Sequence, residues 1–369
     1  MGLQSSGAIS LDNIHEEAGG TSGSTCTIND ADIRGLISAS DGANTSFDDW
    51  YGASSAGDVV LVANGMVNSN PYYTDTILQL SIATNGQNSD FGNLNQLRKQ
   101  VGSASSSTRG LFHSGYGGTD AFQGRSKQID YVTIASAGNA SDFGDVSDGN
   151  NNGAGASNNT RAIFKLGYAA SAGINNIMEY VTIANTGNST DFGDATYASY
   201  AMSSTNSTTR ACFAGGDTST GYTNIIDYVT IANTGNATDF GNLTTTRTTI
   251  NKGSVSSGTY GFFTGGVTTS DNATHHVDYI TIASAGNAGD FGDLNREIKA
   301  GFQSGNKVKG LSGGGYQHTP NNQNLNLVQR DDAVSVFTLG TSGSGSDWGD
   351  MSLEAFECAG ISDDHGGIG

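Results

Sequence analysis

The sequence predicts an all-β protein built from a repeated unit, and two observations support this prediction. A triplet of an acidic residue, an aromatic residue and a glycine occurs six times, starting at Asp90, Asp142, Asp191, Asp239, Asp290 and Asp347. The copies are 52, 49, 48, 51 and 57 residues apart, and a period of about 50 residues is typical of propellers and solenoids. Short runs of Val, Ile and Tyr alternate with segments rich in Gly, Ser, Thr and Asn, which indicates many short strands joined by turns.

The repeats divide the chain into two parts. Six copies occupy about 300 of the 369 residues, so we expect a small N-terminal module at residues 1–57 and a repeat domain at residues 58–369. So short a module has little apolar core of its own. We therefore expect it to dock on another protein.

Composition limits the partners. The formal net charge of −19 comes from 35 acidic and 16 basic residues, and such a surface repels phosphate backbones, so we expect no nucleic-acid partner. No stretch approaches the roughly 18 apolar residues of a membrane helix, and we expect neither a membrane partner nor a signal peptide. Cys26, Cys212 and Cys358 lie outside any CxxC pair, so free thiols are expected.

Three stretches of the N-terminal module carry a resemblance to a known family. They are LQSSGAISLDNIHEEAG from Leu3, DIRGL from Asp32 and SFDDWYGAS from Ser46. Together they resemble a short module that begins tail, fibre and other virion proteins of tailed bacteriophages. The resemblance implies that residues 1–57 attach the protein to other virion proteins. The candidate attachment residues are Ile9, Leu11, Ile14, Phe47, Trp50 and Tyr51.

Each repeat is expected to contain four strands, and the middle repeats have the clearest pattern. A Ser/Thr-rich strand at residues 200–204 opens the unit, and a second strand at residues 210–214 ends at a Gly-Gly pair. A variable loop leads to a third strand at residues 226–232, and residues 238–243 form a short fourth strand. Alternate side chains of the third strand point to opposite faces, and both faces can pack. We expect each sheet to lie between two neighbours.

A Gly-Asn pair follows the third strand in four repeats, at Gly138, Gly187, Gly235 and Gly286. Because glycine adopts positive φ without steric cost, the pair predicts a turn residue with positive φ. The first and last repeats deviate here, and end repeats are often atypical.

These strand features are similar to the kelch family of β-propellers. Phe replaces the family's Trp in five repeats, and Leu166-Gly167 replaces one glycine pair. The resemblance implies a six-bladed kelch-like β-propeller with four-stranded blades over residues 58–369. It says little about function, because propellers host unrelated activities. The matching residues are the pairs Gly215-Gly216, Gly265-Gly266 and Gly313-Gly314, the tyrosines Tyr131, Tyr180, Tyr228 and Tyr279, and Trp348.

The two ends of the repeat domain predict how it closes. Residues 59–65 match the second strand of a repeat, and residues 353–360 match the first. We therefore expect residues 353–362 to pair with residues 59–63, so that the first sheet is built from both ends of the domain. Closure of this kind removes free sheet edges.

The repeated carboxylates, such as Asp142 with Asp145, could act as acid–base pairs, calcium ligands or turn formers. An active site is built once, whereas these residues recur, so we expect each Asp to accept backbone N–H bonds in its own turn. No loop has the spacing of an EF-hand or of a GGxGxDx nonapeptide, which disfavours calcium.

Sialidases offer an enzyme alternative, because they are six-bladed propellers with SxDxGxxW turns. Only Ser189 places a serine two residues before a repeated Asp. Arg109, Arg161 and Arg210 occupy one repeat position that Tyr260 and Lys309 take later, which favours packing over a convergent carboxylate site. We expect no catalytic residues.

Metal and cofactor sites are not expected either. His275-His276 is the one adjacent histidine pair, and adjacent residues on a strand rarely bind one ion together. The Gly-rich stretch 312–315 follows a strand without opening a helix, so it is not a phosphate loop.

Together these observations predict a non-enzymatic structural protein of a tailed-phage virion. We expect a tail fibre or tail-associated receptor-binding protein, exposed on the particle and homo-oligomeric within it. A head (capsid) decoration or fibre protein is one alternative, and a cellular carbohydrate-binding adhesin is another. The expected partners are other virion proteins, through residues 1–57, and a glycan or protein of the host surface.

The loops between second and third strands vary most, at residues 68–75, 116–127, 167–175, 217–224, 267–275 and 315–328. In a propeller these connections emerge on one face, so we expect one binding surface on a rigid scaffold. The alternative is that the loops vary because nothing contacts them. Exposed aromatic side chains with polar partners suit a sugar or a protein surface. The candidate binding residues are Tyr72, Tyr73, Tyr116, Phe122, Arg125, Tyr168, Tyr222, Tyr316 and His318.

Overall fold

The computed structural model describes residue 14 and residues 59–63, 65–67, 72–119, 122–248, 250–269, 272–317 and 329–368. The chain forms two compact units, Met1–Gly57 and Asp58–Gly369. In the first unit, Ile14 is helical and fully buried. The other candidate attachment residues, Ile9, Leu11, Phe47, Trp50 and Tyr51, lie outside the described residues, so attachment through residues 1–57 stays a prediction.

The described part of the second unit is all-β and contains six four-stranded antiparallel sheets. Over the described residues, no helix has the length and apolar character that a membrane span requires. Named from first to fourth strand, the sheets are β38 (Ala359–Ser362), β1 (Val59–Ala63), β3 (Thr76–Ser81) and β4 (Asn88–Asn93); β6 (Gly102–Ser105), β7 (Arg109–His113), β10 (Gln128–Thr133) and β11 (Ser141–Asp145); β13 (Ala154–Ser157), β14 (Arg161–Lys165), β17 (Ile177–Thr182) and β18 (Thr190–Asp194); β19 (Ser203–Asn206), β20 (Arg210–Ala214), β23 (Ile225–Thr230) and β24 (Thr238–Asn242); β26 (Val255–Ser256), β27 (Tyr260–Thr264), β29 (Thr274–Thr281) and β30 (Gly289–Ile298); and β31 (Phe302–Gly305), β32 (Lys309–Gly313), β35 (Ala333–Thr338) and β36 (Ser346–Asp350).

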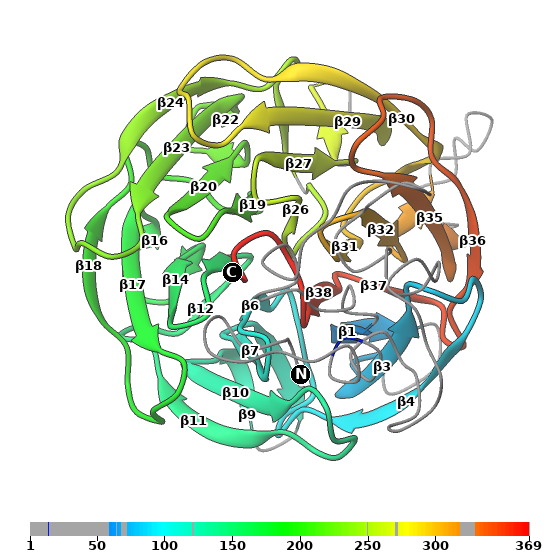
Figure 1. Cartoon of the computed structure of the whole chain (residues 1–369). Helices are drawn as coiled ribbons and strands as arrows, with labels where there is room; N and C mark the ends of the chain where they lie inside the picture. Colours follow the sequence, from blue (N-terminus) through cyan, green and yellow to red (C-terminus); the bar gives the residue numbers. More distant parts are fainter. Residues whose placement is uncertain are drawn as a thin grey trace. The chain divides into compact units, whose positions relative to one another are not determined.

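The six sheets follow one another around a common centre (Figure 1). Their first strands contact one another in cyclic order, from β38 through β6, β13, β19, β26 and β31 back to β38. The fourth strands, including β4, β11, β18 and β36, lie at the periphery in Figure 1. Each sheet therefore packs between two neighbours, as the two-sided pattern of its third strand predicts.

The first strands explain why each repeat opens with Ser and Thr. Small polar side chains fit where the strands converge, and their hydroxyls donate to backbone carbonyls of a neighbouring sheet. Ser157 Oγ donates to Ser105 O at 2.6 Å, and Thr205 Oγ1 donates to Val255 O at 2.8 Å. These bonds satisfy polar groups that lie away from water.

The first sheet joins both ends of the unit, which confirms the predicted pairing for residues 359–362 but not for residues 353–358. β1 pairs antiparallel with β38, with Val60 opposite Ser362 and Ala63 opposite Ala359. The pairing continues nearby, where β2 (Met66–Val67) pairs with β37 (Ala355–Phe356).

The aromatic residues of the six triplets are core residues, as their periodicity suggests. Phe192 is 2% exposed and packs with Phe213 and Val229 of the next sheet. Trp348 is 1% exposed, packs with Leu80 of the first sheet and donates its indole N–H to Ser81 O at 3.0 Å. The triplet aromatics therefore join successive sheets.

The turn after the third strand contacts the preceding sheet, and the prediction of positive φ for its Gly-Asn pair holds in two of four repeats. Gly187 and Gly235 have φ of 156° and 153°, whereas Gly138 and Gly286 lie outside the positive-φ region. The Gly138 N–H donates to Phe91 O at 2.7 Å, and Asn139 Oδ1 accepts the Asn93 N–H at 3.1 Å. The triplet glycine Gly92 also has positive φ, at 148°, and an added Cβ there would meet Gly138 O at 2.3 Å. The close approach of two sheets selects glycine there.

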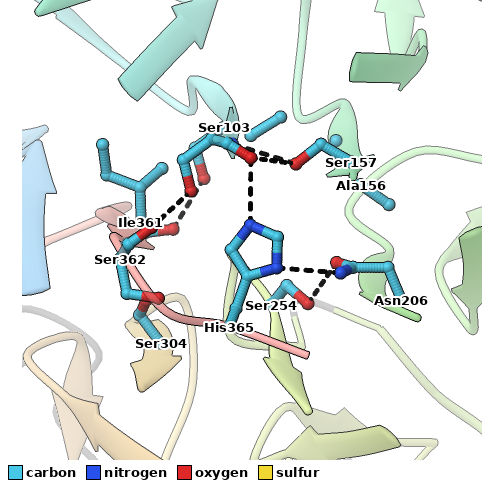
Figure 2. A pocket seen from close by; sticks show the side chains of 13 residues that line it. Ser103, Ala156, Ser157, Asn206, Ser254, Ser304, Ile361, Ser362 and His365 are labelled. Carbon is cyan, nitrogen blue, oxygen red and sulfur yellow. Dashed lines mark hydrogen bonds between the residues drawn. The ribbon is translucent and has the colours of Figure 1, made fainter. Parts of the chain in front are cut away.

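The residues after β38 fill the centre of the cyclic arrangement (Figure 2). His365 is 2% exposed, its Nε2 donates to Ser105 O at 3.0 Å, and its Nδ1 accepts the Asn206 amide at 2.9 Å. Burial lowers the pKa of His365 to about 4, so the ring is neutral at pH 7. The cavity beside it has a volume of about 10 Å³, which leaves no room for a ligand larger than water.

Two of the three cysteines are described, and both match the prediction of buried free thiols. Cys212 and Cys358 form no disulfide and are fully buried. Burial raises the pKa of each thiol to about 12, so both are neutral at pH 7. Cys26 lies outside the described residues.

Candidate binding face

The six sheets have two edges with different connections. We call loop face the edge at which the second strands end and the third strands begin, together with the linkers that precede the first strands. We call opposite face the edge with the turns between third and fourth strands. Because neighbouring strands are antiparallel, connections of one kind lie at the same edge in every repeat. The six variable loops therefore share the loop face.

Each variable loop pairs at its base with the linker of the same repeat. In two repeats the contact is an isolated bridge, Tyr200 with Asp217 and Lys299 with Tyr316. From the second to the sixth repeat in turn, the small strands of the loop face are β5 (Arg98–Lys99), β8 (Tyr116–Thr119) and β9 (Phe122–Arg125); β12 (Asn150–Asn151), β15 (Tyr168–Ala169) and β16 (Gly173–Ile174); β21 (Asp217–Thr218) and β22 (Gly221–Tyr222); β25 (Arg247–Thr248) and β28 (Val267–Thr268); and β33 (Tyr316–Gln317) and β34 (Gln329–Arg330). The bases of the loops are thus held by backbone pairing.

Backbone hydrogen bonds also join the linkers of successive repeats. Glu357 N–H donates to Ala300 O at 2.6 Å, Gln100 N–H to Glu357 O at 3.2 Å, Asn152 N–H to Gln100 O at 2.9 Å, and Ala201 N–H to Asn152 O at 2.8 Å. These five residues have φ between 56° and 62°. Non-glycine residues rarely adopt such angles, which cost about 1–3 kcal/mol each. The surrounding pairing holds the linkers in one conformation.

Lys252 interrupts this series and points its side chain across it. The residue is 4% exposed, and its Nζ donates to Asn152 Oδ1 at 2.9 Å. Burial lowers the pKa of Lys252 to about 7, against the opposing effect of the Glu357 carboxylate. An amine with such a pKa can exchange a proton near neutral pH.

A hydrogen-bonded chain of side chains crosses the loop face. Glu357 lies 3.0 Å from Lys99 Nζ through Oε2 and accepts Gln100 Nε2 at 2.6 Å through Oε1. Gln100 Oε1 accepts Asn151 Nδ2 at 2.6 Å, and Asn151 Oδ1 accepts Arg125 Nε at 2.7 Å. The chain joins residues of three repeats.

Aromatic contacts extend this chain into a fourth repeat. The Arg125 guanidinium lies 4.4 Å from the ring centre of Tyr168. The Tyr168 ring meets that of Tyr200 edge-on at 5.8 Å, and Tyr200 Oη donates to Asp217 Oδ2 at 2.8 Å. Burial and this bond raise the pKa of Tyr200 to about 12. The loop-face network is defined as Lys99, Gln100, Arg125, Asn151, Tyr168, Tyr200, Asp217 and Glu357.

The candidate residues of the variable loops have different places. Arg125 and Tyr168 belong to the loop-face network. The ring centre of Tyr73 lies 5.9 Å from Lys99 Nζ. Tyr222 lies on β22 opposite Asp217. Tyr72 is 55% exposed.

Other candidates are less accessible than predicted or are not described. The Tyr316 ring packs on the buried Phe356 at 4.1 Å, and Tyr116 is half-buried on β8. The expectation that all the loop aromatics are exposed is wrong for these two, because loop and linker pack on each other, and it is also wrong for the half-buried Tyr73 and Tyr222. The Phe122 side chain and His318 lie outside the described residues.

The linker residues of the network were missed by sequence reasoning. Lys99, Gln100, Asn151 and Glu357 precede the first strands, in segments that were expected only to lead into a Ser/Thr-rich strand. Their signal is a polar residue shortly before each first strand that changes type from repeat to repeat.

The recurring arginines and aspartates have structural partners. Arg161 lies over Tyr180, 4.3 Å from its ring centre, and donates to Ile231 O of the next sheet at 2.8 Å. Asp191 Oδ1 accepts the Gly193 N–H at 3.2 Å, and the equivalent bond forms in three other triplets at 3.0–3.1 Å. Both findings confirm the packing and turn roles predicted for these positions.

One cluster of the described residues has the side chains for a metal ion. His275, His276 and Asp293 bring two imidazole nitrogens and a carboxylate oxygen within 4.8 Å of one another. The alternation that led us to expect no shared ion does not hold at this pair, because β29 is irregular between Thr274 and His276.

Comparison with known proteins adds no relative to this picture. The chain matches no family model, and no curated protein matches it.

Proposed function

We propose that residues 58–369 form a six-bladed, kelch-like β-propeller that binds a partner through its loop face. Six four-stranded sheets, the cyclic contacts of their first strands and a first sheet built from both ends support this architecture. A propeller is a rigid scaffold on which loops can vary without loss of the core. The function is binding and not catalysis.

The loop-face network is the observation that carries the binding role. Its members come from four repeats but differ in type at equivalent positions, as Gln100 and Glu357 illustrate. A structural contact of a repeat protein recurs in every repeat, whereas a binding surface is built once. Tyr168, which is 36% exposed, supplies an aromatic face beside the Arg125 guanidinium, and this pairing suits a sugar ring or a protein side chain.

The biological setting that we propose is the particle of a tailed bacteriophage. Residues 1–57 resemble a virion module and form a separate unit. In this proposal that unit attaches to other virion proteins, and the loop face, exposed on the particle, binds a glycan or protein of the host. A tail fibre or tail-associated position fits this division better than a head decoration, because host contact is made by the tail.

Two exposed tyrosines allow a matched test. Tyr168 on the loop face and Tyr260 on the opposite edge are 36% and 40% exposed, and each meets another tyrosine edge-on. Labelled full-length protein is incubated with host bacteria, and the bound fraction is measured for wild type, Tyr168→Ala and Tyr260→Ala. We expect Tyr168→Ala to reduce binding at least tenfold and Tyr260→Ala to leave it unchanged.

The same experiment can refute the proposal. Equal binding by both variants would exclude the loop face as the binding surface. Imaging of labelled protein on purified particles then separates tail from head, and absence from the particles would favour the cellular adhesin.

A further inference from the structure

Two adjacent histidines converge on one carboxylate in the fifth sheet. Asp293 Oδ1 lies 3.3 Å from His275 Nε2 and 3.3 Å from His276 Nδ1. The imidazole side chains are 41% exposed and the carboxylate is 46% exposed. The three groups are thus close enough to share one small ligand and remain open to solvent.

An irregular strand pair explains how both rings reach the same side. Adjacent residues of a regular strand point to opposite faces. Here Thr274 pairs with Ile298 and His276 pairs with Asp293, so two steps on β29 match five steps on β30. Such an irregularity breaks the alternation and re-aims side chains.

The backbone around the cluster is fixed by bonds that do not involve its side chains. Asp293 O accepts the Gly345 N–H at 2.7 Å, and His276 O accepts the Gly265 N–H at 3.0 Å. The His276 N–H donates to Thr274 Oγ1 at 3.2 Å. The backbone that carries the ligating groups is therefore held before any ion binds.

The histidine pair is built once, unlike the acidic position beside it. The residue opposite the position of His276 is Asp in three of the other sheets and Asn in the remaining two. None of these five sheets has a histidine at the position of His276. The equivalent pairs are Thr76 with Asn93, Gln128 with Asp145, Ile177 with Asp194, Ile225 with Asn242 and Ala333 with Asp350. The fold does not need a histidine there.

We propose that His275, His276 and Asp293 bind a divalent first-row transition metal, and that this metal is Zn²⁺. Zinc takes imidazole nitrogen and carboxylate oxygen at about 2.0–2.2 Å in tetrahedral geometry, which places its ligands roughly 3.3–3.5 Å apart. The two nitrogen–oxygen distances of 3.3 Å match this edge. The fourth position faces solvent. Ca²⁺ and Mg²⁺ are disfavoured because they require six or more ligands, nearly all oxygen.

Metal titration of the tag-free, full-length protein tests the site. Zn²⁺ binding is measured by calorimetry, and Co²⁺ binding by the visible absorption of the tetrahedral ion. We expect one site for each metal and none for Mg²⁺ or Ca²⁺ at the same concentrations. Since loss of a group behind a ligand costs 10–100-fold in affinity, His275→Ala, His276→Ala and Asp293→Asn should each weaken binding by more than about 100-fold.

A matched control separates metal binding from a general effect on the sheet. Asp194 occupies the position of Asp293 in β18, and its carbonyl accepts the Ala237 N–H at 2.7 Å as Asp293 accepts Gly345. Asp194→Asn should bind Zn²⁺ like wild type. Absence of Zn²⁺ binding in wild type, or binding that survives the three variants, overturns the proposal and leaves an ordinary histidine–carboxylate pair. Melting curves without metal verify that the variants are folded.

Discussion

At the opposite face one contact recurs between successive sheets in the same form, whereas the side chains of the loop-face network differ from repeat to repeat. The recurring contact is a hydrogen bond from a turn glycine to the carbonyl of the preceding triplet aromatic. It joins Gly138 to Phe91, Gly187 to Phe143, Gly235 to Phe192, Gly286 to Phe240 and Gly343 to Phe291, at 2.6–3.1 Å.

The loop face has the same backbone plan but different side chains. Linkers and loops pair there in every repeat, yet the side chains that meet are Glu357 with Gln100 in one place and Tyr168 with Tyr200 in another. The recurring contacts hold neighbouring sheets in one geometry, so they keep one residue type in each repeat. The side chains of the loop-face network are not subject to this requirement, so they can differ and contact a partner.

Removal of residues 351–369 should have the largest effect on stability. It takes away β37, β38 and the segment that fills the centre, and it exposes the edge of β1, including Leu61. We expect a loss of more than about 5 kcal/mol of unfolding free energy, or aggregation of the exposed edge. Denaturant unfolding measures the loss. Removal of residues 1–57 serves as the control and should leave the main transition unchanged, and equal transitions for both truncations would contradict closure by β38.

A single triplet aromatic should come next. Phe192→Ala leaves a cavity between the third and fourth sheets and should cost about 3–5 kcal/mol. The neighbouring exposed Asp191 loses only its bond to the Gly193 N–H when changed to Ala, at a cost of about 1 kcal/mol. The two urea midpoints test the comparison. A small effect of Phe192→Ala would show that the triplet is not a packing unit.

His365 should make stability depend on pH. Its pKa is about 4 in the folded protein against 6.5 for a solvated histidine, so the unfolded chain binds a proton between these values and the folded chain does not. Stability is then fully present above about pH 6.5 and is lost as pH falls to about 4, by up to roughly 3 kcal/mol.

Unfolding at pH 7, 5.5 and 4.5 measures this loss. His365→Asn should be less stable at pH 7 and should have a flatter pH dependence. His113, whose pKa burial lowers to about 3, contributes in the same direction and remains in the variant. An unchanged slope in His365→Asn would assign the whole effect to other groups.

Strand order, the buried aromatics and the pairing of β1 with β38 could be predicted from the sequence because they follow from a pattern that repeats. Alternation in residues 226–232 and six triplets leave few arrangements open. The six-bladed propeller itself remains a proposal. The contact of the Gly-Asn turn with the preceding sheet, such as that of Asn139 with Asn93, was not predicted because it leaves no local signal.

The candidate site was less predictable for a related reason. Arg125 and Tyr168 lie in loops whose variability marks them, but their partners Gln100 and Asn151 come from linkers far from them in sequence. The same holds for His275 and His276, since the local pattern predicts alternation and the irregular pairing with Asp293 depends on β30. Contacts that occur once are set by tertiary structure and not by periodicity.

The smallest expected change in stability is that of Arg125→Lys, and it separates the two faces most sharply. Lysine keeps the charge but lacks the planar guanidinium, so the bond to Asn151 and the stacking on Tyr168 are lost at a half-exposed site. We expect a stability loss below about 1 kcal/mol with host binding reduced nearly as far as in Arg125→Ala. Arg161→Lys is the matched control, because Arg161 stacks on Tyr180 in the same way but bonds to Ile231 O and Ala232 O of the next sheet. Arg161→Lys should lower the free energy of unfolding more, by about 1–2 kcal/mol, and should leave host binding unchanged. Stability and binding that fall together in both variants would mean that the two faces do not divide these tasks.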